Sequence, residues 1–296
     1  MNFDSAQGYA RKADEYKSRG EYHKALEYLE YALDLDSTLS HVRLNLGWSH
    51  FMLEDFDAAS EVFSECIRRH QNDAYAFYGR GLAQSEIGKY QLAIEDLTEA
   101  IRLDPNISEA HFSLGTCFSK VGRRRDSITA FSECLRLDPE HPPALLSRGT
   151  TYALFGQREA ALVDLTKHID MEPNNWVALH CRARVNLHLT NYLNAVSDFD
   201  GALDACPDLG KLAHVTFLER GFCHAMNGDF QEAMSDYNEA IKLDSHNFQV
   251  YVNRAKVFQN MGDTKAAEND IEKALLEGLP KENANQLRRE LDPGKE

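Results

Sequence analysis

The sequence predicts an all-α protein that is built from repeated pairs of helices. Small residues recur at a fixed interval: Ala25, Ala59 and Ala93 are each 34 positions apart, and the series continues to Ala267 with a single interval of 38. Large apolar residues between them follow helical spacing, and only 8 prolines occur in 296 residues. A period of this length is the signature of a repeat architecture, and few prolines means few breaks in the helices.

The first helix of each repeat is expected to end at a turn that glycine supplies. Glycine readily adopts the left-handed backbone conformation with which many helices terminate. The turn positions are Gly20, Glu54, Gly88, Gly122, Gly156, Thr190, Gly228 and Gly262. Glu54 and Thr190 depart from the pattern.

The second helix of each repeat carries an apolar stripe. In one repeat, Ile94, Leu97 and Ile101 lie at i, i+3 and i+7, which places them on one helical face. A proline then marks the end of several second helices, as at Asp104-Pro105. One hairpin of this kind cannot bury its own apolar face, so we expect neighbouring hairpins to stack and bury it jointly.

Eight such units cover residues 6–281. The predicted units are 6–39, 40–73, 74–107, 108–141, 142–175, 176–209, 214–247 and 248–281. Gly210–Ala213 stand between units six and seven and are expected to lengthen a loop. Residues 282–296 hold Leu287 and Leu291 at i and i+4 among charged residues, which predicts a capping helix followed by a flexible tail.

These features resemble the tetratricopeptide repeat (TPR) family. Residues 78–105, YGRGLAQSEIGKYQLAIEDLTEAIRLDP, are close to the family pattern throughout, and the resemblance covers about residues 6–281. It implies a right-handed superhelical solenoid of about eight 34-residue helix-turn-helix units, whose first helices line a concave groove. It also implies protein binding, without indicating a particular partner.

Charge and composition exclude several classes of function. Lys and Arg number 32 and Asp and Glu number 47, so the net charge is −15 and neither nucleic acid nor an anionic membrane is an expected partner. No apolar run is long enough to insert into a membrane. The first residues lack the basic and apolar pattern of a secretory signal.

No motif indicates catalysis or a cofactor. The six cysteines form no CxxC pair, the twelve histidines form no HExxH motif, and phosphate-binding loops and nucleophile elbows are absent. We therefore expect no enzyme and no catalytic, cofactor-binding or metal-binding residues. Cys66, Cys134, Cys117 and Cys223 occupy repeated small-residue positions, which predicts reduced core thiols and a cytoplasmic or nuclear location.

The resemblance also indicates which residues face the groove, because these lie at the second, fifth, sixth and ninth places of a unit. The predicted partner-binding residues are Leu44, Asn45, Trp48, Tyr75, Tyr78, Phe112, His180, Arg184, Phe222, Asn253 and Lys256. Large apolar side chains are concentrated in units two to four, which favours docking of a peptide or helical segment there. The alternative is that Leu44, Tyr78 and Phe112 only pack between adjacent first helices.

Two charged features bear on the partner. Arg123, Arg124 and Arg125 form the one basic run, which is either a solvated turn or a secondary docking spot for an acidic group. The carboxylate clamp with which some family members hold chaperone C-terminal tails is absent. Only Asn45 matches that clamp, and Asp14 would repel the ligand.

The leading hypothesis is a non-catalytic scaffold or adaptor that holds a segment of a partner protein in the groove. The alternative is a targeting or assembly subunit of a multiprotein complex, such as a ciliary, transport or chaperone-associated complex. Such a subunit would use the convex face and the ends of the solenoid.

Overall fold

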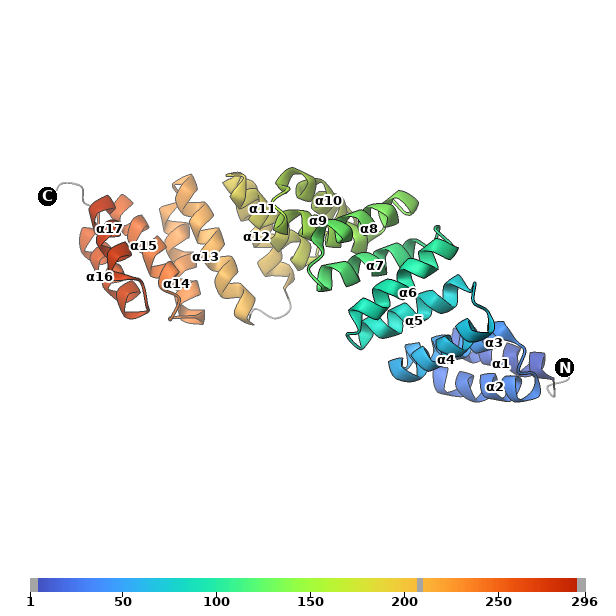
Figure 1. The fold of residues 1–296 in the computed structure, drawn as a ribbon. Coiled ribbons are helices and arrows are strands. Elements are labelled where there is room, and N and C mark those ends of the chain that lie inside the picture. Colours follow the sequence, from blue (N-terminus) through green and yellow to red (C-terminus); the bar gives the residue numbers. More distant parts are fainter. Residues whose placement is uncertain (1–4, 207–209, 292–296) are drawn as a thin grey trace. The chain divides into compact units, whose positions relative to one another are not determined.

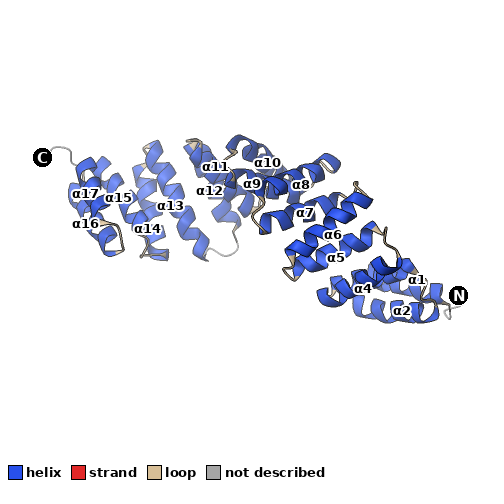
Figure 2. Cartoon of the chain, in the orientation of Figure 1, coloured by secondary structure: helices blue, strands red, loops and turns tan. Residues whose placement is uncertain are grey.

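The computed structural model describes residues 5–206 and 210–291, and within these ranges it is helical throughout, with no strand (Figures 1 and 2). This confirms the predicted all-α repeat fold. In chain order the helices are α1 (Ala6–Ser18), α2 (Tyr22–Leu35), α3 (Ser40–Met52), α4 (Phe56–Arg69), α5 (Ala74–Glu86), α6 (Tyr90–Leu103), α7 (Ser108–Lys120), α8 (Arg124–Leu137), α9 (Pro142–Leu154), α10 (Arg158–Met171), α11 (Trp176–His188), α12 (Tyr192–Ala205), α13 (Gly210–Asn227), α14 (Phe230–Leu243), α15 (Phe248–Asn260), α16 (Thr264–Leu276) and α17 (Lys281–Leu291).

By its internal contacts the chain divides into two compact halves, Met1–Thr151 and Tyr152–Glu296. In each half, consecutive helices form hairpins: α1 packs on α2 and α5 on α6 in the N-terminal half, and α11 packs on α12 and α13 on α14 in the C-terminal half. Neighbouring hairpins also contact one another, as α4 contacts α5 and α14 contacts α15. The apolar faces are therefore buried between neighbours, as stacking requires.

The turns within the hairpins have left-handed backbone conformations. Gly88 has a φ of 77°, and its N–H and that of Lys89 donate to the carbonyl oxygens of Ser85 and Gln84 at 3.0 and 2.8 Å. Glu54 and Thr190 adopt the same conformation, each with a φ of 61°. A β-branched residue such as threonine is strained there, so the repeat geometry prevails over the local preference of the residue.

A large side chain of the second helix lies directly beneath a glycine of the first. Phe63 of α4 is fully buried, and a Cβ atom at Gly47 of α3 would lie 2.7 Å from its Cε1 atom. A Cβ at Gly79 of α5 would overlap the same ring. Phe131 lies equally close to Gly115, at 2.6 Å from the site of a Cβ. The helices therefore approach one another to a distance that only glycine permits.

The repeated small residues of the second helices mark the line of closest contact. They are fully buried: Ala25, Ala59, Ala93, Ser127, Ala161, Ala195 and Ala233.

A buried ion pair recurs within the hairpins. Arg80 of α5 donates from Nε and Nη2 to both carboxylate oxygens of Asp96 of α6, each at 2.7 Å. Its Nη1 donates to Ser64 Oγ of α4 at 3.2 Å, so one guanidinium joins three helices of two hairpins. The same arrangement links Arg182 to Asp198 and Thr166, Arg220 to Asp236 and Asp200, and Arg254 to Asp270 and Asn238.

Two units replace this ion pair with apolar side chains. The equivalent positions hold Leu46 and Val62 in unit two, and Leu114 and Ala130 in unit four. Leu46 and Leu114 are partly buried against hydrophobic clusters formed mainly by the preceding hairpins, and Ala130 is buried. Unit one holds Lys12 and Tyr28 there, so the repeat accepts an ion pair, an apolar pair or another combination at this place.

The prediction that Gly210–Ala213 lengthens a loop is wrong, because these residues belong to α13. This helix has 18 residues, whereas the neighbouring first helices α11 and α15 have 13. Lys211, Leu212 and Ala213 all favour helix, so the added residues extend the helix at its N-terminal end.

The C-terminal helix α17 covers the last hairpin. Its Ala284 and Leu287 are buried in a cluster with Ile271 and Ala274 of α16. Arg288 of α17 also forms an ion pair with Glu268 of α16. The rest of the predicted tail, residues 292–296, lies outside the described residues.

Removing one partner of the ion pair is expected to destabilise the fold far more than replacing both. Asp96→Ala leaves the largely buried Arg80 guanidinium without its carboxylate and should lower the free energy of unfolding by about 2–4 kcal/mol. The double variant Arg80→Leu/Asp96→Ala reproduces the combination that unit four carries and should lose less than about 1.5 kcal/mol. Urea unfolding followed by circular dichroism checks both. A double variant as unstable as Asp96→Ala would contradict the interpretation.

Relieving the strain at Thr190 is expected to stabilise the C-terminal half. Thr190→Gly relieves backbone strain worth about 1–2 kcal/mol. Glycine also raises the entropy of the unfolded chain, which offsets part of this stabilisation. The net increase of about 0.5–1 kcal/mol in the free energy of unfolding should raise the urea midpoint. The matched control is Gly156→Thr, at a turn with a φ of 79° where a Cβ meets no atom within 4 Å. Gly156→Thr should lower the free energy of unfolding. An unchanged urea midpoint in either variant would contradict the argument.

Candidate functional site

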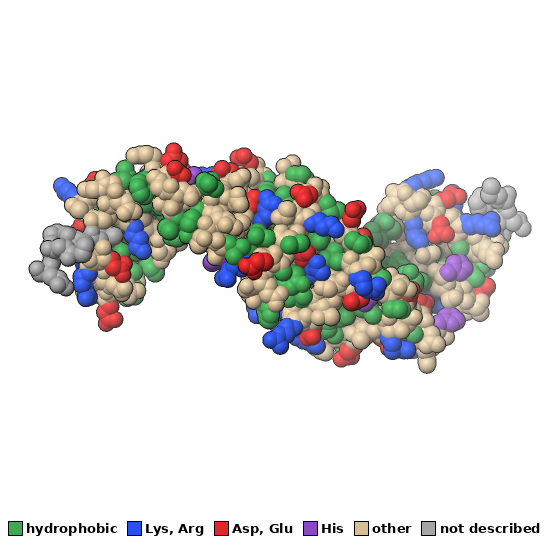
Figure 3. Space-filling model, turned by 90° about the horizontal axis from the view of Figure 1, so that it is seen from above, with side chains coloured by type: hydrophobic (Ala, Val, Ile, Leu, Met, Phe, Trp, Pro, Cys, Tyr) green, Lys and Arg blue, Asp and Glu red, His purple; other side chains and the backbone are tan. Residues whose placement is uncertain are grey.

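The first helices lie in a row in each half of the chain. In the N-terminal half α3 contacts α5 and α5 contacts α7, and in the C-terminal half α11 contacts α13 and α13 contacts α15. The surface that such a row presents is called here the first-helix surface. All eleven residues that the sequence predicted to face a groove belong to first helices. Over the molecule as seen in Figure 3, acidic and basic side chains are interspersed with hydrophobic ones.

Five of the predicted residues form an aromatic strip on α3, α5 and α7. The Trp48 ring centroid lies 5.7 Å from that of Tyr78 on the next first helix and 5.3 Å from that of the buried Phe63. Leu44 packs against the same Phe63 cluster. Leu44, Trp48 and Tyr78 are partly buried, so each contributes to packing and also leaves part of its surface to solvent. The aromatic strip consists of Leu44, Trp48, Tyr75, Tyr78 and Phe112.

Tyr78 is held by its hydroxyl as well as by its ring. Burial, and to a smaller extent the negative charge of Glu109, raise the pKa of Tyr78 to about 12, although a hydrogen bond with Ser113 acts in the opposite direction. The hydroxyl is therefore protonated at neutral pH.

Phe112 is packed beneath a histidine. Its ring lies 5.0 Å from the imidazole of His141 and 5.8 Å from Phe131. His141 Nδ1 accepts a hydrogen bond from the N–H of Ala144 at 3.1 Å, so the ring proton lies on Nε2, which donates to Glu109 Oε1 at 3.1 Å. Glu109 is thereby fixed beside the strip while its side chain is 55% exposed.

Tyr75 is the most exposed member of the strip, at 51%. It lines a shallow pocket of about 650 Å³ at the junction of the α4–α5 loop and the end of α6. Asp73, Leu103 and Asp104 line the same pocket. An exposed ring, an aliphatic side chain and two carboxylates therefore meet at one place on the edge of the strip.

The predicted residues of the C-terminal half form a more polar group. His180 is buried, at 8% exposure, and its Nε2 lies 3.8 Å from Glu219 Oε2. Arg184 Nε lies 3.1 Å from the other carboxylate oxygen, Oε1. Burial, with a further effect of the Arg184 charge, lowers the pKa of His180 to about 4, and burial raises the pKa of Glu219 despite Arg184. His180 is thus neutral at pH 7 and has little surface to offer a partner.

The other predicted residues are less closely grouped. Phe222 packs edge-on against Tyr192 at 6.3 Å. Asn253 Oδ1 accepts from Gln249 Nε2 at 2.9 Å, and Lys256 is exposed one turn further along α15. In the N-terminal half, Asn45 Nδ2 lies 3.5 Å from Asp14 Oδ1. These positions share the first-helix surface without forming a cluster.

Comparison with family models identifies the repeats. Models described as tetratricopeptide repeat match residues 17–80, 74–107 and 108–141, and a model described as TPR repeat matches residues 226–262. The solved structure of YrrB, described as a TPR protein with an unusual peptide-binding site, is 30% identical over 61% of this chain and 93% of YrrB, with a TM-score of 0.51. The chain belongs to the tetratricopeptide repeat family.

Two further solved structures share the TPR fold. MamA from Desulfovibrio magneticus RS-1 is 23% identical over 58% of this chain and 97% of its own, with a TM-score of 0.53. A tetratricopeptide repeat protein from Parabacteroides merdae is 16% identical over 97% of this chain and 98% of its own, also with a TM-score of 0.53. A comparison with curated proteins gave no match. TPR proteins bind other proteins, so this chain is a protein-interaction scaffold in the general sense.

The arginine run of this TPR protein is partly engaged. The Arg123 guanidinium lies 4.4 Å above the ring of Phe118 and its Nε donates to Asp126 at 2.6 Å. Arg124 and Arg125 are exposed. The acidic residue on the first turn of α8 thus offsets part of the basic charge.

Residues 5–206 and 210–291 contain neither a metal site nor a helix suited to span a membrane. No group of three His, Cys, Asp or Glu side chains there is arranged to hold a metal ion. No helix in these ranges has the length and apolar character that a membrane span requires.

Sequence reasoning did not identify Asp73 or His141 as part of the site. Asp73 precedes α5 and accepts hydrogen bonds from the N–H groups of Tyr75 and Ala76, each at 3.1 Å, which is the behaviour of an N-cap. An aspartate just before a predicted helix is a recognisable signal. No sequence signal relates His141 to Phe112, because that contact depends on how two hairpins stack.

The cysteines are expected to react slowly in the native protein and completely after unfolding. All six are free, and burial raises the pKa of Cys66 to about 11 and that of Cys134 to about 12. A pKa near 11 leaves about 0.1% thiolate at pH 8, against about a quarter for an ordinary thiol. Alkylation followed by intact-mass measurement should therefore be at least about a hundredfold slower at Cys66 and Cys134 than in the unfolded chain. Unfolding without a reductant should release six reactive thiols, and a smaller number would reveal a disulfide.

Proposed function

We propose that this TPR protein is a non-catalytic scaffold that binds a peptide or helical segment of a partner protein on the aromatic strip. The observation that carries the proposal is the continuity of the strip. Three neighbouring first helices contribute partly exposed large side chains, with Trp48 and Tyr78 in ring contact across α3 and α5. Aromatic side chains of this kind are the usual anchors of protein interfaces.

Two further points support this proposal. A continuous row of helices presents a docking surface for an extended or helical segment, whose side chains can meet it at regular intervals. The relative YrrB is described as having a peptide-binding site. The reduced state of the six thiols also supports a cytoplasmic or nuclear location.

A second candidate is an assembly subunit that uses its second helices. Val163 of α10 and Leu193 of α12 are 69% and 72% exposed, although most second-helix surface positions are polar. Exposed apolar side chains such as these are typical of an interaction surface, which here would lie on the second helices. Substitutions on the two surfaces distinguish the candidates.

Tyr75→Ala is the sharpest test of the strip. Trp48 packs on Phe63, so Trp48→Ala should weaken both binding and folding, whereas Tyr75 is half exposed and its loss should leave the unfolding midpoint unchanged. Truncation of an aromatic anchor costs about 1–2 kcal/mol or more, so the dissociation constant should rise at least about five- to thirtyfold. The probes are peptides selected from a random library on the immobilised chain, and calorimetry measures their affinity.

Two matched variants control this experiment. Arg124→Ala removes an exposed charge and Leu193→Ala removes an exposed second-helix side chain, and each should change the dissociation constant less than about threefold. Peptides that are insensitive to Tyr75→Ala but lost with Arg124→Ala would assign binding to the arginine run. Loss with Leu193→Ala would favour the second-helix surface.

A further inference from the structure

The aromatic strip has a border of carboxylates. Asp73 and Asp104 line the pocket beside Tyr75, and Glu109 is bound to His141, whose imidazole lies 5.0 Å from the Phe112 ring of the strip. We infer that the segment bound on the strip is basic, with Lys or Arg side chains next to its apolar anchors. The inference rests on the proposed function and adds the chemistry of the partner.

The two pocket carboxylates have capacity for a cation. Asp73 Oδ1 accepts from the N–H groups of Tyr75 and Ala76, and Asp104 Oδ1 accepts from the N–H of Asn106 at 3.0 Å. In both cases the backbone engages Oδ1, and a carboxylate can accept several hydrogen bonds. The residues that line the pocket include no Lys or Arg.

The backbone around the pocket also favours a cation. Helices α4 and α6 end at the pocket, where His70 and Asp104 are their C-caps. The C-terminal end of a helix carries a partial negative charge and favours cations. The N-terminal end of α5 also lies here, but the Asp73 side chain caps it.

The lining of the pocket fits a long basic side chain. The methylene groups of Lys or Arg can lie along Leu103 and the Tyr75 ring, while the charged end reaches the carboxylates. The basic side chains next to the lining residues, Arg69 and Arg102, are already paired with Glu65 and Glu99 of their own helices. The surface around Tyr75 is therefore acidic within reach of a bound segment.

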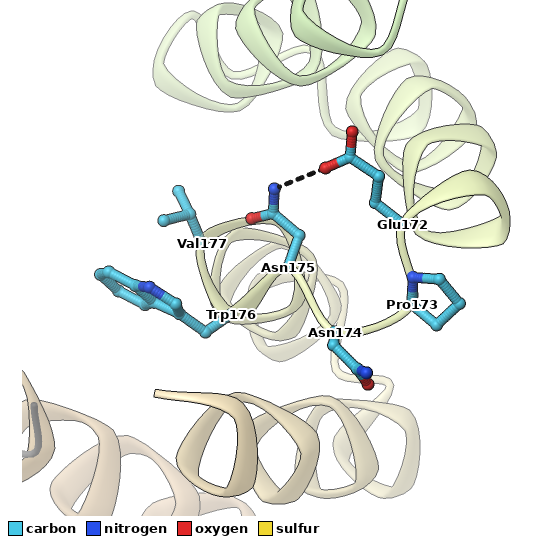
Figure 4. Close-up of a pocket in the computed structure, with 6 residues that line it drawn as sticks. All are labelled: Glu172, Pro173, Asn174, Asn175, Trp176 and Val177. Atoms are coloured by element: carbon cyan, nitrogen blue, oxygen red, sulfur yellow. Dashed lines mark hydrogen bonds between the residues drawn. The ribbon is translucent and has the colours of Figure 1, made fainter. Parts of the chain in front are cut away.

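The equivalent junction in the C-terminal half shows a different lining. Figure 4 shows Glu172, Pro173, Asn174, Asn175, Trp176 and Val177 around that pocket. Its single carboxylate, Glu172, accepts a hydrogen bond from Asn175 Nδ2 at 3.2 Å, drawn as a dashed line. Asn175 stands where the strip has Asp73. The Asp104 position is acidic in several other units, as Asp36, Asp138, Glu172 and Asp244, so Asp73 is the carboxylate that distinguishes the pocket beside Tyr75.

The test uses a pair of variants with the same change in net charge. Asp104→Asn/Glu109→Gln, the border variant, neutralises two of the three border carboxylates but keeps an oxygen acceptor for Asn106 and for His141. Glu61→Gln/Glu95→Gln neutralises two exposed carboxylates on the second helices α4 and α6. Peptides selected on the wild-type chain that Tyr75→Ala weakens are sequenced, and their affinities are measured at low and moderate salt. Thermal unfolding shows that each variant is folded.

The selected peptides should be enriched in Lys and Arg. The border variant should weaken them about fivefold at low salt, since each exposed pair contributes modestly, and the control variant less than about twofold. Added salt should weaken binding to the wild type more than binding to the border variant.

Three results would overturn the inference. The inference is refuted if the strip-dependent peptides have no excess of basic residues, or if their affinity falls equally in the border and control variants. Either result leaves the proposed function standing. Self-association of the chain that Tyr75→Ala abolishes would make a second copy the occupant. Peptides insensitive to Tyr75→Ala refute the proposed function and this inference with it.

Discussion

The contact of Phe63 with two glycines sets the spacing on which the N-terminal half depends. This ring lies beneath Gly47 of its own hairpin and Gly79 of the next, so one side chain fixes the distance from α4 to α3 and to α5. Trp48 and Tyr78 are the chain neighbours of those glycines. Their ring contact at 5.7 Å is therefore a consequence of the same close approach. A larger residue at Gly79 would move α5 away from α4 and interrupt the strip, so core packing and the binding surface cannot vary independently.

The buried Arg–Asp pair is a second device for joining hairpins, and the chain does not use it everywhere. Arg80 joins α5 and α6 to α4, but Leu46 and Leu114 stand at the equivalent positions in units two and four. A buried ion pair gains little over an apolar pair of similar volume, although it is costly to leave half complete. This is consistent with units two and four, where both residues of the pair are apolar. The aromatic strip spans these two units and the one between them, so ring packing is prominent where two of three hairpins lack the ion pair.

The repeat phase was predictable from the sequence, whereas the exposure of individual side chains was not. A period of 34 residues located the turns, including Glu54 and Thr190, because the stacking of hairpins requires one backbone conformation there whatever the residue. The helical extension at Gly210 was missed because a count of inserted residues does not reveal whether they join a helix or a loop. Among the residues predicted to face the groove, Tyr75 is half exposed and His180 is buried. Tyr75 holds the second place of its unit and His180 the fifth. Tyr78 and Phe112 share the fifth place with His180 but are only partly buried, so the degree of burial depends on the side chains that neighbouring hairpins bring near.

The charge of the chain and the charge around the strip act at different ranges. A net charge of −15 attracts any basic partner from a distance and raises the rate of encounter, but it does not select a place on the surface. Selection requires carboxylates that are fixed in position and lie next to an apolar anchor site. Asp104 is held by the Asn106 N–H and Glu109 by His141, so both are oriented before a partner arrives. In the C-terminal half, Glu219 is already paired with Arg184 within the protein. A basic segment drawn to the whole chain would therefore find its strongest combination of apolar contact and unneutralised charge at Tyr75, where the side chain also has the smallest structural role.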